Sequence, residues 1–161
     1  MKRGTTAGIL AGVIVLFGCL TGYFTLAGPP QPANTALVDV AATNAVTDQV
    51  GRAIRTVFSY DPSRLDQTAQ AAGEVLTGAA MDQYNSLFGK AKDNAIATQQ
   101  VLTTAVRSIG VIDMHDDAAR LLVFVDRQLV QGDKHESAVA QLIVHAARSG
   151  DTWKITEIQV L

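Results

Sequence analysis

The chain has 161 residues, with 13 basic and 15 acidic side chains and a single cysteine. This length suits one domain of ordinary size plus an additional segment. The slight net negative charge offers no basic surface for nucleic acid or for anionic lipid headgroups. Because Cys19 is the only thiol, the chain beyond it holds no disulfide, no cysteine zinc site and no cysteine nucleophile.

An uncharged apolar segment follows Lys2 and Arg3, and the next charged residue is Asp39. Its core runs from Ala7 to Ala27, which matches the roughly 20 residues that cross about 30 Å of hydrocarbon. The positive charges on the short flank place the N-terminus in the cytoplasm and the rest of the chain outside. Residues 1–27 are therefore expected to form a short cytoplasmic tail and a single-pass anchor in the cytoplasmic membrane.

Other interpretations of this segment stay open. Thr25-Leu-Ala27 ends in a small residue that a signal peptidase accepts, although the apolar stretch is longer than that of most signal peptides. Leu16-Phe-Gly-Cys19 resembles a lipoprotein signal, but a bulky residue before the glycine is unusual there. Gly8-x-x-x-Gly12 and Gly18-x-x-x-Gly22 have the spacing that allows two membrane helices to approach closely.

The segment at 28–36 is expected to be an extended linker, because Gly28-Pro-Pro-Gln-Pro-Ala33 contains three prolines. An extracytoplasmic domain would then occupy residues 37–161. From Leu37 to Tyr60, apolar side chains recur at steps of three and four, which predicts a long amphipathic helix. Asp61-Pro62 ends this helix, since the residue before a proline avoids the α region.

Two shorter helices are expected next. Asp61 or Ser63 would cap the first of them, and Gly78 would break or bend the chain after it. The second covers Ala79–Leu87. The segment Lys90–Gln99 has weak periodicity and would either extend this helix or form a loop.

The last part of the chain changes to β-branched residues separated by short turn sequences. The expected strands are Gln100–Met114, Ala119–Gln131, Ser137–Arg148 and Thr152–Val160. Short turns between consecutive strands imply an antiparallel meander. Helices followed by a meander predict an α+β domain, with about three helices packed on a curved four-stranded antiparallel sheet.

Several short motifs follow the apolar segment in a distinctive order: Phe58-Ser-Tyr-Asp-Pro62, Leu76-Thr-Gly78, Tyr84, Gly110-Val111, Leu122-Val-Phe-Val125 and Gly150-Asp-Thr-Trp-Lys-Ile155. In this order the chain resembles the Mce-associated membrane proteins of actinobacteria. The resemblance covers the chain from about Leu37 to its end. It implies an NTF2-like, or SnoaL-like, cone outside the cytoplasmic membrane.

The same resemblance implies a function and partners. The protein would be a non-enzymatic accessory subunit of an Mce-type lipid or sterol importer in the cell envelope, acting by assembly or stabilisation of the transport complex. Its partners would be the Mce transporter proteins, the cytoplasmic membrane and lipid, with neither nucleic acid nor a cofactor. Self-association through an exposed sheet face is left open.

NTF2-like cones also host enzymes, so each side chain suited to catalysis could be either catalytic or structural. The candidates are Tyr60, Asp61, Asp126, His115 and His145. Tyr60 and Asp61 belong to an aromatic-plus-turn motif with a structural role. His145 is interpreted as a hydrogen-bonded sheet histidine.

The other charged candidates are also expected to be structural. His115, in a turn with Asp116 and Asp117, is interpreted as a solvated loop residue, and His135 in the turn Gly132–Glu136 likewise. Asp126 is expected to pair with Arg127 or Arg148, an interaction worth little energy at the surface. No second histidine has ligand-like spacing, and no phosphate loop or serine nucleophile motif is present.

The expectation is therefore no catalytic, cofactor-binding or metal-binding residue. Two alternatives remain, namely a membrane-tethered NTF2-like enzyme of the isomerase or cyclase type acting on a hydrophobic small molecule, and a VirB8-like assembly component of a secretion system. A deep pocket where His145, Asp126 or Tyr60 converge would favour the enzyme. A filled cone with an exposed apolar patch would favour a subunit that works by contact.

Overall fold

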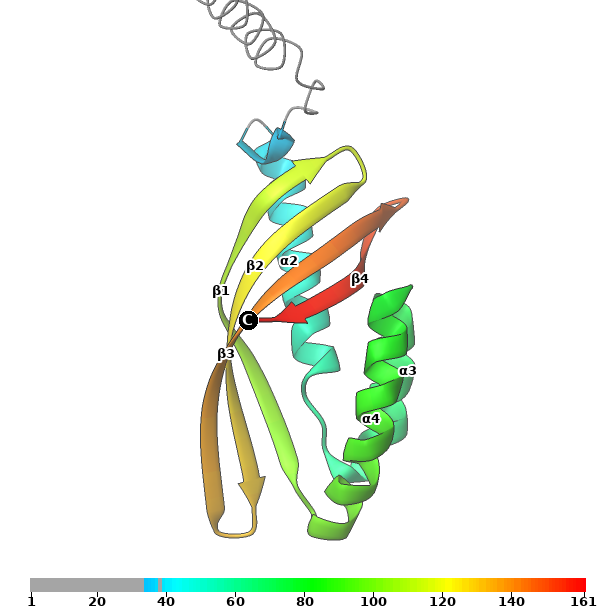
Figure 1. The fold of residues 1–161 in the computed structure, drawn as a ribbon, viewed down its shortest axis with the longest axis vertical. Helices are drawn as coiled ribbons and strands as arrows, with labels where there is room; N and C mark the ends of the chain where they lie inside the picture. Colours follow the sequence, from blue (N-terminus) through cyan, green and yellow to red (C-terminus); the bar gives the residue numbers. More distant parts are fainter. Residues whose placement is uncertain (1–33, 38) are drawn as a thin grey trace, which may run out of the picture. The chain divides into compact units, whose positions relative to one another are not determined.

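A computed structural model describes residues 34–37 and 39–161 (Figure 1). The expected anchor at 1–27 and the linker as far as residue 33 lie outside the described residues. Among the residues described, no helix is both long and apolar enough to cross a bilayer. The elements are η1 Thr35–Leu37, α2 Val40–Val57, η2 Pro62–Arg64, α3 Leu65–Val75, α4 Ala79–Thr98, β1 Val101–His115, β2 Ala118–Gln131, β3 Lys134–Ser149 and β4 Thr152–Val160.

The long first helix is confirmed as α2, with ends slightly inside the expected ones. The Asp39 side chain caps it by accepting a hydrogen bond from the Ala42 N–H (2.8 Å). Val46, Val50 and Ile54 recur on one face and are fully buried. This spacing of four residues places one stripe of the helix against the sheet.

Asp61 is the residue that caps the next turn, since its carboxylate accepts from the Ser63 N–H (2.9 Å) and hydroxyl (2.7 Å). η2 and α3 follow, and α4 begins directly after Gly78. The Lys90–Gln99 segment continues α4 as far as Thr98, so the helix is about twice as long as the predicted Ala79–Leu87. A left-handed Gln99 (φ 53°) then ends it.

The four-stranded antiparallel meander, in the order β1-β2-β3-β4, confirms the expected α+β fold. Three tight turns join the strands, with positive φ at Asp116, Gly132 and Gly150. The third strand starts at Lys134, three residues before its predicted start. The turn predicted at Gly132–Glu136 is therefore too long. The turn at Gly132 is tight, and His135 belongs to β3, where it pairs with Val130 of β2.

One face of the curved sheet packs on the helices to form the core. Leu121, Val123 and Val125 of β2 point to this face and are buried, as the alternation in the sequence predicts. Figure 1 shows α2 lying lengthwise along this face, with α3 and α4 on the same side. The Trp153 side chain lies in the core. The backbone N–H of Trp153 donates to Gln49 Oε1 (2.8 Å), and this bond connects β4 to α2.

Candidate functional site

A groove of about 480 Å³ opens between α4, the end of α2 and the strands β1, β2 and β4. Aliphatic and aromatic side chains make most of its lining. Tyr60, Gln83, Tyr84 and Arg127 supply the polar groups. A concave, mainly apolar site with a few polar groups is the usual form of a binding site for apolar ligands or segments.

The position of α4 beside the sheet is set at its first residues. The Thr77 N–H donates to the Ile155 carbonyl (2.9 Å), and Leu76 forms an isolated parallel β-bridge with Ile155 of β4. Gly78 then turns the chain at φ 56° and ψ −139°, a conformation available to glycine without strain. Farther along, the Gln83 side chain accepts from the Ile158 N–H of β4 (3.3 Å). The segment before α4 therefore fixes the wall of the groove.

Two stacked aromatic rings lie in this wall. The ring centroids of Tyr84 and Phe88 are 4.9 Å apart, with 18° between the ring planes. Tyr84 is only 9% exposed, and none of the described residues binds its buried hydroxyl. Burial raises the pKa of Tyr84 to about 12, because the charged phenolate is poorly solvated there.

The rim of the groove is apolar and open to solvent. Leu87 of α4 is 66% exposed, and Val160 at the end of β4 is 70% exposed. Arg127 of β2 points to the helix-covered face, since it continues the inward alternation of Val123 and Val125. No described residue forms an ion pair with it. The site thus offers an apolar surface with one unpaired positive charge at its side.

Of the predicted candidates, Tyr60 alone lines this groove. Its backbone pairs with Leu102 at the edge of β1, with two hydrogen bonds of 2.9 Å. Asp61 does not line the groove but lies in an adjacent hollow that Tyr60 also borders. Hydrogen bonds from Ser63 lower the pKa of the Asp61 carboxyl group. Tyr60 therefore borders both hollows, whereas Asp61 borders only the second.

Asp126 and His145 lie on strand positions that face away from the helices. The predicted pairing of Asp126 with Arg127 or Arg148 is wrong. Its carboxylate instead accepts from Arg107 Nε (2.9 Å) and Nη2 (2.8 Å), because a bulge in β1 brings Arg107 onto the same face. These candidates therefore do not converge with Tyr60 on one point.

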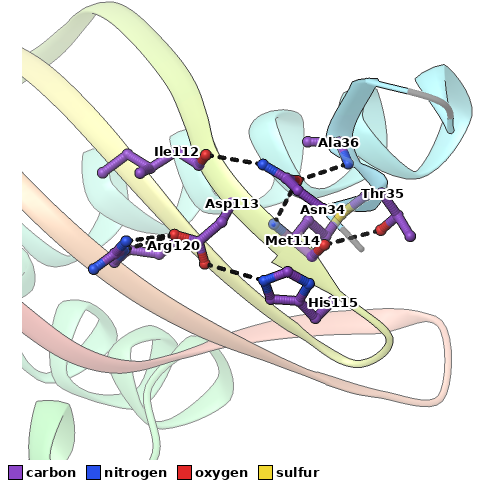
Figure 2. A network of polar contacts seen from close by, with 8 residues as sticks. All are labelled: Asn34, Thr35, Ala36, Ile112, Asp113, Met114, His115 and Arg120. Carbon is purple, nitrogen blue, oxygen red and sulfur yellow. Dashed lines mark hydrogen bonds and ion pairs between the residues drawn. The ribbon is translucent and has the colours of Figure 1, made fainter. Parts of the chain in front are cut away.

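His115 is the last residue of β1, so its predicted place in the following turn is wrong. Its Nε2 lies 4.0 Å from Asp113 Oδ1, and Asp113 also binds Arg120 (2.6 and 2.8 Å) (Figure 2). Within residues 34–37 and 39–161, no group of three His, Cys, Asp or Glu side chains is placed to bind a metal ion.

The same strand end holds the beginning of the described chain. Asn34 donates to the Ile112 carbonyl (3.2 Å) and accepts from the Met114 N–H (3.1 Å), while the Thr35 hydroxyl donates to the Met114 carbonyl (3.0 Å) (Figure 2). The end of the predicted linker is therefore part of the folded unit and lies on the outer edge of β1.

Sequence reasoning did not find the groove itself. The pattern places Leu87 on a helix and Val160 on a strand, but it does not show that both side chains stay exposed. A usable signal is present in α4, where Met81, Tyr84 and Phe88 form one apolar row and Leu87 lies beside it. The apolar stripe is therefore wider than burial against the sheet requires.

No protein-family model matches the chain. An uncharacterized protein of Mycobacterium tuberculosis, Rv1362c, is 27% identical over an alignment of 152 residues that covers 92% of this chain and 68% of that protein. A periplasmic fragment of TraM superposes with a TM-score of 0.63 at 13% identity, covering 73% of this chain and 96% of that one. CagV of Helicobacter pylori, a VirB8 homolog of a type IV secretion system, gives 0.60 at 12% identity, covering 73% and 96%. At these identities the likeness shows the NTF2-like fold that VirB8-type domains share.

Proposed function

We propose that the chain is a non-enzymatic assembly component of a membrane-embedded transport machine, of the VirB8 type, and that a partner protein docks in the groove. The observation that carries the proposal is the open apolar rim formed by Leu87 and Val160 over the stacked rings of Tyr84 and Phe88. An exposed apolar surface of this kind costs solubility, and it is usual where a partner covers it.

The arrangement of polar side chains supports contact over catalysis. An enzyme acting on a hydrophobic small molecule needs an acid or base within hydrogen-bonding reach of the reacting atoms. The groove holds Tyr60 and Tyr84 but neither Asp126 nor His145. The absence of a catalytic role is part of this proposal.

An extracytoplasmic position is also part of the proposal. It is supported by the apolar segment behind Lys2 and Arg3 and by the fold shared with periplasmic fragments such as that of TraM. Held near a membrane, the domain would present the groove to subunits anchored in the same bilayer.

Purification of the full-length chain from native membranes in mild detergent tests this function. We expect secretion or transport subunits to co-purify in defined ratio and to be identified by mass spectrometry. Recovery of the chain alone, under conditions that keep such complexes whole, would contradict the proposal. A hydrolase or isomerase activity that tracks with the pure chain would contradict it as well.

The second candidate is an accessory subunit of an Mce-type lipid importer. Two observations favour it: the ordered motifs from Phe58 to Ile155, and a groove of a size and polarity that suit an acyl chain with an anionic headgroup near Arg127. Co-purification of Mce proteins, together with native mass spectrometry that finds a bound lipid, distinguishes this role from secretion. A bound lipid should be lost in Arg127→Glu if the headgroup lies there.

A further inference from the structure

The outer edge of β3 is open in its first seven residues, 134–140. β4 pairs with β3 from Leu142 to Ser149, and the Leu161 N–H adds a hydrogen bond to the Gln141 carbonyl (2.9 Å). Before Gln141, none of the described residues pairs with this side of β3. We call residues 134–140 of β3 the open edge. Its other side is paired with β2 along its whole length.

The periodicity of the strand shows which backbone groups are unpaired. In an antiparallel sheet, the N–H and C=O of one residue point to the same neighbour, and those of the next residue point to the other. Because the Gln141 carbonyl faces β4, the backbone groups of Val139, Ser137 and His135 face outward from the open edge. Three outward-facing residues therefore offer donors and acceptors to a further strand.

The other sheet edges are protected in ways that the open edge is not. The outer edge of β1 is interrupted by two bulges and is contacted by Asn34, Thr35 and Tyr60. The outer edge of β4 binds the Thr77 N–H and the Gln83 side chain. Proteins usually protect edges with bulges, prolines or covering loops.

The open edge, by contrast, is regular. Its pairing with β2 has no register shift, it contains no proline, and its lysine lies at the very end. Val139, in the middle of this segment, is 78% exposed. A regular edge without a bulge, a proline or a covering loop, and with an exposed valine, is a template for strand addition.

We propose that the open edge joins two copies of this chain, with β3 pairing antiparallel to β3 of the second copy about a two-fold axis at Ser137. In this register Val139 lies opposite His135, and Glu136 lies opposite Ala138. Lys134 lies opposite Ala140, so residues 134–140 are all paired. No two like charges face each other, and every outward N–H and C=O finds a partner.

Neighbouring registers are poorer. Moving the axis to Glu136 places two carboxylates directly opposite each other, which is destabilising in a sheet. Moving it to Ala138 places His135 opposite Gln141, whose carbonyl already accepts from the Leu161 N–H. A symmetric contact of this kind uses the same patch on both molecules, as most homodimers do. The inference does not depend on the function of the groove.

Cysteine cross-linking of the full-length chain in detergent tests the register, with Cys19→Ala as the background. In a hydrogen-bonded antiparallel pair, Cα atoms lie about 5.5 Å apart, within the range of about 4.4–6.8 Å that a disulfide spans. Ser137→Cys should therefore link two copies under mild oxidation. Val139→Cys is the control, because its own counterpart would lie four residues along the strand, about 14 Å away.

We expect the Ser137→Cys dimer to form at least tenfold faster than the Val139→Cys dimer, although Val139 is itself 78% exposed. Equal rates for the two variants, or no dimer from Ser137→Cys, would overturn the proposal. An extended peptide from a partner protein would then be the remaining occupant of the edge.

A proline tests the same contact without oxidation. Ser137→Pro removes an outward N–H and leaves the bonds to β2 intact, a position where sheets accept proline. Light scattering should show a dimeric mass for the wild type and for Ser137→Ala, and a monomeric mass for Ser137→Pro. The circular dichroism spectra should match. A monomeric wild type, or a dimeric Ser137→Pro with a native spectrum, would exclude this interface.

Discussion

Tyr84 combines a buried aromatic ring with a hydroxyl that no described residue binds. A buried polar group without a partner costs about 1–3 kcal/mol, whereas its ring contributes through burial and through stacking on Phe88. The residue therefore carries opposing contributions to stability, and substitution separates them.

Tyr84→Phe should keep the ring and remove the cost of the hydroxyl. We expect the free energy of unfolding to stay the same or to rise by about 1 kcal/mol, while Tyr84→Ala should lose about 3–5 kcal/mol. Guanidinium unfolding followed by the fluorescence of buried Trp153, the only tryptophan, measures both. A loss in Tyr84→Phe as large as that in Tyr84→Ala would mean that the hydroxyl is bound after all.

The raised pKa of Tyr84 also predicts an alkaline effect on stability. Its folded-state pKa of about 12 lies above the ordinary 10.0, so the unfolded chain loses this proton first. Stability from this group is complete below pH 10 and falls as the pH rises towards 12. Between those values the wild type should lose stability more steeply than Tyr84→Phe; identical slopes would contradict the burial of the hydroxyl.

At the scale of elements, the turn before α4 is the most constrained point of the domain. Gly78 has a backbone conformation that side-chain-bearing residues rarely adopt, and the groove wall begins directly after it. Gly73, in the last turn of α3, has helical geometry and open space where a Cβ would be. The two glycines form a matched pair.

Gly78→Ala should lower the free energy of unfolding by about 1–3 kcal/mol through backbone strain. Gly73→Ala should raise it by about 0.5–1 kcal/mol, because alanine favours helix. Thermal unfolding of both variants checks the pair. If Gly78→Ala were as stable as the wild type, α4 would not be fixed by this turn.

The sequence pattern predicts the elements better than it predicts their ends and their surfaces. The alternation of Leu121, Val123 and Val125 and the turn glycines are local signals, so the meander and its order could be read directly. The length of α4 could not be predicted from the sequence, because the residues after Lys90 have weak periodicity. The groove depends on the distance between α4 and Val160. This distance is set by tertiary packing, and no local sequence pattern indicates it.

Charge pairing shows the same limit. The partner of Asp126 is Arg107, which lies on the neighbouring strand and comes within reach through a bulge. Sequence neighbours such as Arg127 point to the opposite face. Register and bulges decide which side chains meet across a sheet, and neither can be read from a single sequence.

At the scale of the whole molecule, the proposed function requires the domain to lie outside the cytoplasm. A C-terminal alkaline phosphatase fusion to the full chain should be active, and a fluorescent-protein fusion at the same point should be dark. The matching fusions in a chain with Lys2 and Arg3 replaced by Asp should shift towards the opposite pattern. A bright fluorescent fusion in the wild type would place the domain in the cytoplasm.

The central claim is that partners bind through the groove, and one comparison on a single helix tests it most directly. Leu87 and Ile96 are both exposed residues of α4, at 66% and 48%, but only Leu87 lines the groove. In native membranes, Leu87→Asp should reduce the co-purifying partner proteins at least tenfold, while Ile96→Asp should retain them, with equal amounts of folded chain. Equal retention by both variants would contradict the account.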